Sequence, residues 1–268
     1  MKGEELKQIV KEKYGKIAGQ NSDKQTSCCG SSCCGTEVDY TMFSEDYKNK
    51  KGYIPDADMN LGCGIPTDFA GIKEGDHILD LGSGAGNDCF VARALVGESG
   101  KVTGLDLTEQ MMVKARENCT KLNYSNVEFV IGDIEAMPFG DKLFDVVISN
   151  CVLNLVPDKS KAFKEIFRVL KPGAHFCVSD VVVKGNLPEK LQKDAEMYVG
   201  CVSGASEISQ YLNYIENSGF RNVKVHKQKE IALPESILSE YYDDFEINSF
   251  HPGEKGIYSI TVTAEKPL

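Results

Sequence analysis

Cysteine is the residue type whose spacing in this chain points most directly to chemistry. The stretch TSCCGSSCCGT, residues 26–36, places four cysteines within seven positions, namely Cys28, Cys29, Cys33 and Cys34. The opening residues MKGEELKQIVKEKYG carry charges throughout and form no signal-peptide pattern, so we expect a cytoplasmic protein whose thiols stay reduced. In that compartment a cluster of cysteines indicates metal binding or catalysis more often than a structural disulfide.

Three further cysteines lie at the edges of predicted elements. Cys63 stands between two glycines in NLGCGIP, Cys151 directly follows Asn150 at the end of an apolar run, and Cys201 follows a glycine in YVGCVSGA. Such positions favour ligand binding over core packing, because ligands bind at the carboxyl edge of an open α/β sheet. We expect Cys89, Cys119 and Cys177, which fall inside predicted helices and a strand, to be ordinary core residues.

Sulfur ligands select soft ions, and two kinds of ion remain open at this point. Zinc is one, but CCGSSCCG is too compact for a comfortable tetrahedron, although Cys29 and Cys33 with two distant ligands would still be possible. A trivalent pnictogen such as arsenite takes three thiolates and keeps a lone pair. It fits the number of cysteines at Cys63, Cys151 and Cys201 better.

The elements that position these residues alternate between strand and helix. Short apolar runs predict strands at 77–83, 101–106, 127–133, 144–150 and 174–183, and helical periodicity predicts helices at 88–97, 108–122, 159–173 and 188–200. This order predicts a Rossmann-like, doubly wound, mostly parallel sheet. A later helix at 206–220 and strands at 222–233 and 256–265 predict an antiparallel edge.

We expect three parts along the chain. Residues 1–60 hold an amphipathic helix, with Leu6, Val10 and Tyr14 on one face, and then a polar Cys-rich segment that we expect to be mobile. Residues 61–203 form the cofactor-binding core. Residues 204–268 form an α+β region that completes the sheet and the thiol site.

A glycine-rich turn follows the first predicted core strand. Gly82, Gly84 and Gly86 in DLGSGAGND let the backbone approach a ligand closely, and Asp106 ends the next strand, where a carboxylate accepts hydrogen bonds from ribose. Both a dinucleotide and S-adenosylmethionine contain adenosine. The G-x-G-x-G spacing and Asp88 near the helix start favour the cationic S-adenosylmethionine over a pyrophosphate.

The motifs ILDLGSGAG, VTGLD, GDIEAMPF, FDVVISN and RVLKPG, in this order, resemble the class I S-adenosylmethionine-dependent methyltransferases. The resemblance covers residues 76–180. It implies that the glycine turn lines the methionine end of the cofactor. The cofactor-binding residues expected from the turn and from the resemblance together are Asp80, Gly82, Gly84, Gly86, Asp106, Leu107, Asp133, Ile134 and Asn150.

The motifs LGCGIP, SNCVLNLVPDKSKAF, SDVVV and YVGCVSGA, over residues 62–220, more specifically resemble the arsenite S-adenosylmethionine methyltransferases. The resemblance implies that Cys63, Cys151 and Cys201 bind trivalent arsenic and that an N-terminal cysteine, for which we choose Cys29, takes part in catalysis. It implies arsenic detoxification, with arsenite or its thiol adduct as substrate and glutathione or thioredoxin as reductant. Because exchange onto sulfur needs thiolates, we expect lowered cysteine pKa values.

Two other functions stay open from the residues alone. One is a class I methyltransferase of a small organic molecule, with zinc on the cysteines, and the other is a non-enzymatic thiol-based binder of arsenite or metal. A net charge of −10 and a pI near 5.0 argue against nucleic acid as a partner. We expect no membrane association and a monomer, with thioredoxin among the candidate partners.

Overall fold

The computed structural model describes residues 3–19, 45–185, 201–202, 204–232, 239 and 256–268. The four N-terminal cysteines Cys28, Cys29, Cys33 and Cys34 lie outside these residues, as does the helix predicted at 188–200. The Cys-rich segment predicted to follow the first helix therefore stays a prediction.

One sheet organises the described residues. Its strands are β1 (His77–Leu81), β2 (Lys101–Asp106), β3 (Val127–Ile131), β4 (Phe144–Asn150), β5 (Leu170–Lys184), β6 (Ser206–Glu207), β7 (Arg221–Ile231) and β8 (Gly256–Glu265). They lie in the order β3-β2-β1-β4-β5-β8-β7, with β6 beside β5. Strands β1 to β5 are parallel, β8 is antiparallel to β5, and β7 is antiparallel to β8. The predicted mostly parallel sheet with an antiparallel edge is confirmed.

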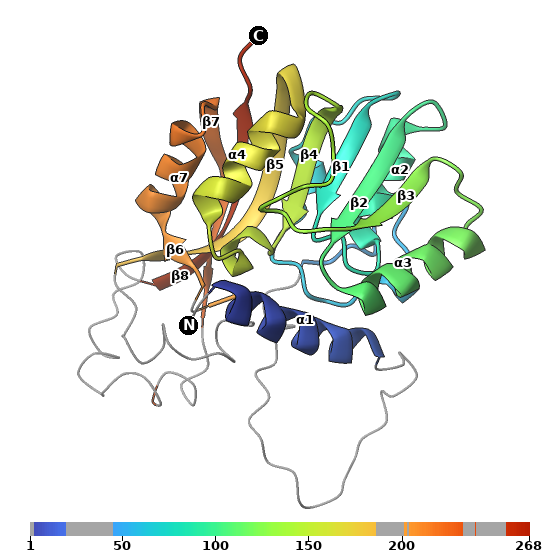
Figure 1. The fold of residues 1–268 in the computed structure, drawn as a ribbon, viewed down its shortest axis with the longest axis horizontal. Helices are drawn as coiled ribbons and strands as arrows, with labels where there is room; N and C mark the ends of the chain where they lie inside the picture. The colour runs from blue at the N-terminus through green and yellow to red at the C-terminus, as the bar shows by residue number, and fades with distance from the viewer. Residues whose placement is uncertain (1–2, 20–44, 186–200, 203, 233–238, 240–255) are drawn as a thin grey trace, which may run out of the picture.

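Helices cover both faces of this sheet (Figure 1). Apolar side chains of α2 (Asn87–Val96) and α3 (Glu109–Lys121) pack on one face, and those of α4 (Lys159–Val169) and α7 (Ile208–Asn217) pack on the other. Helix α4 ends four residues before the predicted boundary, because β5 begins at Leu170 and Pro172 cannot continue a helix. Short 3₁₀ turns lie at η2 (Pro55–Ala57), η3 (Pro66–Asp68) and η4 (Leu153–Leu155).

Helix α1 (Gly3–Gly19) lies outside these two layers. It crosses the end of the sheet to which the parallel strands point, where their carboxyl ends meet (Figure 1). The pattern of Leu6, Val10 and Tyr14 predicts this helix correctly, and these three side chains pack against a cluster at that edge. Within the described part of the chain, no helix is long and apolar enough to cross a membrane.

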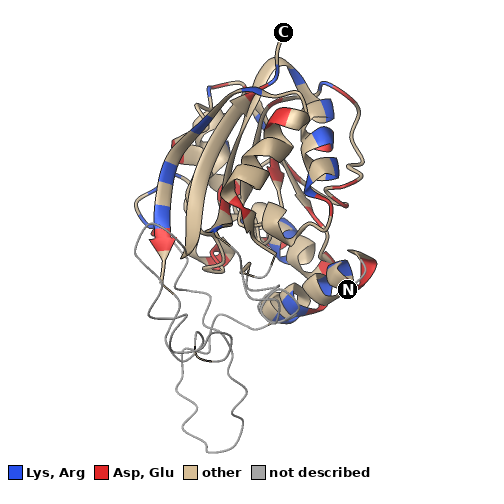
Figure 2. Cartoon of the chain, turned by 90° about the vertical axis from the view of Figure 1, so that its left-hand side faces the viewer, with Lys and Arg blue, Asp and Glu red and all other residues tan. Residues whose placement is uncertain are grey.

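Basic side chains follow the outer strand β7, as the charge colouring of Figure 2 shows. Lysines on an edge strand hinder pairing with another sheet. One of these lysines, Lys227, also forms a 2.7 Å ion pair with Glu45, which lies two residues before Tyr47. This pair fixes the chain where it enters the active-site region.

Candidate active site

A cleft opens at the carboxyl ends of β1, β2 and β4. Most of the residues predicted to bind a cofactor line it: Asp80, Gly82, Gly84, Asp106, Leu107, Asp133, Ile134 and Asn150. Lys7, Val10 and Tyr14 of α1 complete its wall. Residues distant in sequence therefore meet in one cavity at the edge where open α/β sheets bind ligands.

The glycine turn between β1 and α2 forms the floor of the cleft. Gly82 and Gly84 have φ values of 67° and 51°, a region that side chains with a Cβ rarely adopt. A Cβ on Gly84 would point into open space, with no protein atom within 4 Å. Gly86 differs from the prediction, because it caps α2 and packs against Phe90 and Phe129 and does not line the cleft.

Asp106 lies at the end of β2, beside this turn. Its carboxylate accepts hydrogen bonds from the backbone N–H groups of Gly84 (2.9 Å) and Thr108 (2.8 Å). Burial raises the pKa of Asp106, although these backbone hydrogen bonds favour the charged form. The carboxylate is therefore held in one orientation at the wall of the cleft.

The loop after β3 carries Asp133 and Ile134 to the opposite wall. Lys7 of α1 donates to Asp133 at 2.6 Å and also pairs with Glu135, whose side chain is buried. The pKa of Lys7 is raised, since these two carboxylates outweigh the cost of burial. The N-terminal helix is thus tied to the loop of Asp133 and Ile134, two of the residues expected to bind the cofactor.

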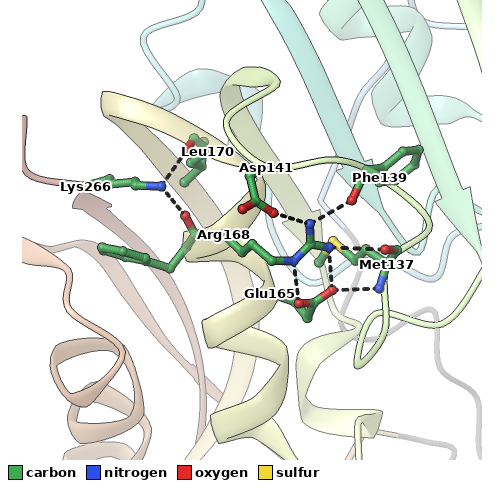
Figure 3. Close-up of polar contacts among 8 residues, drawn as sticks. Met137, Phe139, Asp141, Glu165, Arg168, Leu170 and Lys266 are labelled. Carbon is green, nitrogen blue, oxygen red and sulfur yellow. Dashed lines mark hydrogen bonds and ion pairs between the residues drawn. The ribbon is translucent and has the colours of Figure 1, made fainter.

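Arg168 of α4 holds the same loop from behind (Figure 3). Its guanidinium donates to the carbonyl oxygens of Met137 and Phe139 and forms ion pairs with Glu165 and Asp141. Glu165 in turn accepts from the Met137 N–H at 2.8 Å. A loop fixed at this many points presents its carboxylate to the cleft in one position.

Asn150 joins the cleft to the Cys63 loop. Its Oδ1 accepts from the backbone N–H groups of Cys63 (3.0 Å) and Gly64 (3.3 Å), and its Nδ2 donates to Tyr47 (2.9 Å) and to Asp88 (3.1 Å). Tyr47, which is buried, donates its hydroxyl to Asp88 at 2.7 Å. The amide of Asn150 therefore sets the position of the first predicted arsenic ligand.

Two buried carboxylates stand at the inner end of the cleft. Burial raises the pKa of Asp88 to about 6, even though Tyr47 and Asn150 stabilise its charge. Burial and the charge of Asp88 raise the pKa of Asp80 well above its usual range, and Cys89 donates its thiol hydrogen to Asp80. A cation bound beside these two carboxyl groups would favour their charged forms and lower both pKa values.

Cys63, Cys151 and Cys201 lie in one buried cluster next to the cleft, with exposed fractions of 2%, 4% and 5%. Cys151 also lines the cleft itself. The Cys151 thiol lies within hydrogen-bonding reach of the other two thiols, and Cys201 donates to the Cys151 carbonyl oxygen at 3.5 Å. Among the described residues, no three His, Cys, Asp or Glu side chains already surround a single point as a metal site.

The expectation of lowered thiol pKa values is wrong for these cysteines. Burial raises the pKa of Cys63, and its hydrogen bond to Cys151 together with burial raises the pKa of Cys201 well above the usual range. Cys201 favours the Cys151 thiolate, but Cys63 and burial outweigh that effect and raise the pKa of Cys151. The expectation came from the need for thiolates in sulfur exchange and took no account of burial, which the sequence does not show for these three thiols.

The remaining described cysteines pack in the core, as predicted. Cys89 lies in α2, Cys119 in α3 and Cys177 in β5, and all three are buried. Sequence reasoning did not identify Lys7 and Tyr47 as site residues. No motif marks either residue, and a contact across 126 positions, as between Lys7 and Asp133, has no local signal.

Comparisons with known proteins agree with this geometry. Residues 72–219 match a family described as a methyltransferase domain. The fold, the glycine turn and the cleft thus define a class I methyltransferase. An arsenite methyltransferase of Halobacterium salinarum is 36% identical over 98% of this chain and 67% of its own length. The human arsenite methyltransferase is 34% identical over 81% of this chain and 58% of its own length.

A solved structure supports the same relationship. The arsenic(III) S-adenosylmethionine methyltransferase from Chlamydomonas reinhardtii superposes with a TM-score of 0.66 at 36% identity, over 77% of this chain and 68% of that one. The chain belongs to the arsenite methyltransferase family.

Proposed function

We propose that this protein transfers the methyl group of S-adenosylmethionine to trivalent arsenic held by cysteine thiolates. The observation that carries the proposal is that Cys63, Cys151 and Cys201 form one cluster and that Cys151 also lines the cleft. A thiol-bound arsenic there would lie next to the methyl donor. Holding two reactants in contact accounts for roughly 7–11 kcal/mol of the barrier in well-oriented reactions.

The cleft suits S-adenosylmethionine in shape and in polarity. Ser83 Oγ and Asn87 Oδ1 are buried in its wall without a hydrogen-bond partner among the described residues, and the space over Gly84 is open. Asp106 and Leu107 would hold the ribose, Asp133 and Ile134 the adenine, and Asp80 and Asn150 the methionine end. The bound cofactor would supply an electrophilic methyl group on a sulfonium.

The reaction balances with thiols as the only further reagent. An arsenite thiol adduct exchanges three sulfur ligands with Cys63, Cys151 and Cys201, and each departing thiolate takes the proton of the cysteine that replaces it. The arsenic lone pair forms the As–C bond while the sulfonium C–S bond breaks, which formally oxidises arsenic by two electrons. Two cysteine thiolates return those electrons and form a disulfide, while one As–S bond breaks and its sulfur leaves as a thiolate, so that methylarsenic(III) keeps two sulfur ligands. Glutathione or thioredoxin then reduces the disulfide.

We further propose that the N-terminal cysteines Cys28, Cys29, Cys33 and Cys34 capture arsenic first, with Cys29 as the working thiol. The division into parts at 1–60, 61–203 and 204–268, the cytoplasmic location and the monomeric state belong to the same proposal. The supporting observation is that Tyr47 brings the chain that follows these cysteines into contact with the Cys63 loop, through Gly64.

The test is incubation of the reduced protein with arsenite and isotopically labelled S-adenosylmethionine, followed by chromatographic separation of methylarsenicals. We expect labelled methylarsenic from the wild type and at least a hundredfold less from Cys63→Ser, Cys151→Ser and Cys201→Ser. Cys119→Ala, a change at a buried cysteine of α3 that does not line the cleft, is the control and should retain activity. Absence of methylated arsenic from the wild-type protein would refute the proposal.

Methylarsenic production and ligand binding, measured together, separate the other functions. A methyltransferase of an organic substrate would bind S-adenosylhomocysteine but give no methylarsenic. A non-enzymatic binder would hold arsenite without binding S-adenosylhomocysteine at all. Binding of both ligands together with methylarsenic production is the result that only the proposed activity predicts.

A further inference from the structure

Asn154 is a buried residue of the turn between β4 and α4, and no step of the proposed reaction uses it. Its side chain is fully buried in η4, three residues after Cys151. The Nδ2 group donates to the carbonyl oxygen of Cys201 at 2.8 Å. The side chain also lies within hydrogen-bonding reach of the Cys201 thiol, where it favours the thiolate. One amide thus joins the turn of Cys151 to the turn of Cys201.

The backbones of both cysteines adopt the left-handed conformation. Cys151 has a φ of 58° and Cys201 a φ of 68°. Residues with a Cβ seldom adopt this region, because Cβ crowds the following carbonyl oxygen, and it persists only where surrounding contacts enforce it. The Cys151 N–H is held by Ser179 O at 2.7 Å, and the Cys201 carbonyl is held by Asn154. Each strained cysteine therefore has one hydrogen bond that fixes its turn.

The two polar atoms of the Asn154 side-chain amide, Oδ1 and Nδ2, differ in their hydrogen bonding. Its Oδ1 is buried and has no hydrogen-bond partner in the part of the chain that the structure describes. An amide that only stabilises a core normally satisfies both ends, since an unpaired buried polar atom is costly. In Asn154 only the Nδ2 group has a hydrogen-bond partner among the described residues, and that partner is the carbonyl oxygen of Cys201.

Buried charges hold Asn154 in place. Lys159 donates to the carbonyl oxygens of Asn154 (3.0 Å) and Val156 (3.2 Å). Asp180, buried beneath the turn, accepts from the Tyr211 hydroxyl at 2.9 Å and from the Asn154 backbone N–H. The amide is thus anchored through its own backbone, and its side chain can hold the Cys201 turn without moving away.

We propose that Asn154 is a positioning residue for arsenic capture, which fixes the Cys201 turn against Cys151 so that both sulfur atoms reach one As(III) ion. This inference rests on the proposed function and adds a residue outside both the thiols and the cofactor cleft. Asn154 does not line that cleft, whereas its neighbours Val152 and Leu155 do. Its loss should therefore impair arsenite binding and leave cofactor binding intact.

The test is Asn154→Asp, which keeps the shape of the side chain and replaces the donor with an acceptor that repels the Cys201 carbonyl. We expect the KM for arsenite and the Kd for arsenite to rise about tenfold or more, as for loss of a buried hydrogen-bond donor. The KM for S-adenosylmethionine and the Kd for S-adenosylhomocysteine should stay within twofold. Alkylation of Cys201, followed by mass spectrometry, should lose its protection by arsenite.

Asn126→Asp is the matched control. The Nδ2 of Asn126 also donates to backbone carbonyls, those of Gly97 (2.9 Å) and Gly100 (2.8 Å), but it lies before β3 at the other end of the sheet. The Asn126→Asp variant should bind arsenite and S-adenosylhomocysteine with unchanged affinity. Asn154→Ser, uncharged and too short to reach Cys201, gives the same expected result should Asn154→Asp fail to fold.

Two outcomes would overturn the inference. One is an Asn154 variant with the arsenite affinity of the wild type, and the other is an equal loss of arsenite and S-adenosylhomocysteine affinity, which indicates a merely structural residue. Failure of the wild type to produce methylarsenic would instead contradict the proposed function. The protection of Cys201 by arsenite would still report on Asn154, because it needs no turnover.

Discussion

Lys7 and Asp133 are joined by a 2.6 Å ion pair that links the N-terminal helix to the loop after β3. The side chain of Lys7 is only 13% exposed, and it also pairs with Glu135. Leu6, Val10 and Tyr14 of the same helix pack against the thiol cluster, and Val10 and Tyr14 share with Lys7 the helix face that lines the cleft. Helix α1 therefore covers the cofactor cleft and the thiols together.

The first prediction concerns this cover. Lys7→Met should loosen α1 by about 1–2 kcal/mol, because it leaves two partly buried carboxylates without a cation. Hydrogen exchange of the α1 amides should then become about 5–30 times faster, and Cys151 should be alkylated faster. Lys11→Met, an exposed change on the same helix, is the control. Unchanged exchange in Lys7→Met would show that the ion pair does not hold α1.

The second prediction concerns the space over the glycine turn. Gly84→Ala places a methyl group where no protein atom lies within 4 Å, so the methyl group should occupy space that the cofactor needs. We expect S-adenosylhomocysteine affinity to fall at least tenfold by calorimetry, while left-handed strain lowers the free energy of unfolding by only about 1 kcal/mol. Gly140→Ala, in a turn away from the cleft, should change neither quantity. Normal cofactor affinity in Gly84→Ala would mean that the cofactor does not approach this turn.

The third prediction follows from the raised thiol pKa values. Only the thiolate reacts, so alkylation of Cys63, Cys151 and Cys201 in the free protein should speed up about tenfold per pH unit between pH 7 and 9. Mass spectrometry of peptides labelled with iodoacetamide measures each site separately. A rate that is already maximal at pH 7 would show that these thiols are ionised there, as the sequence alone predicts.

The fourth prediction concerns stability and pH. Burial raises the pKa of Asp180 to about 7, above the value near 3.8 of an unfolded chain. The folded state therefore binds more protons than the unfolded state between pH 4 and 7, and stability from this group is lost as pH rises through 7. Asp180→Asn should remove this loss, so its stability relative to wild type should increase by about 2–3 kcal/mol from pH 5 to 7.5.

Urea unfolding of both proteins at pH 5, 6, 7 and 7.5 measures this difference. Comparing the two proteins at each pH cancels the contributions of other groups, such as Asp88, whose pKa is about 6, and His77, whose pKa is lowered by burial. A constant difference across this range would show that Asp180 does not titrate there.

The local sequence was sufficient to predict the alternation of strands and helices. Apolar runs of six to ten residues and helical periodicity located β1 to β5 and α2 to α4 close to their observed bounds. The glycine turn could also be predicted from the sequence, because positive φ values and a close approach of the backbone to a ligand restrict the residue type to glycine. The one difference there is Gly86, which contacts two phenylalanine rings from α2 and β3 that sequence spacing does not bring together.

The sequence by itself determined the class of fold, and it predicted the edge of the sheet at which the site lies and the three described thiols, because each depends on residue type and short-range spacing. Only the tertiary structure decided that Lys7 reaches Asp133, that Asn154 holds Cys201, and that the thiol pKa values rise rather than fall. The physical reason is that hydrogen bonds between distant segments and the low dielectric of a buried cluster arise only when the chain has folded.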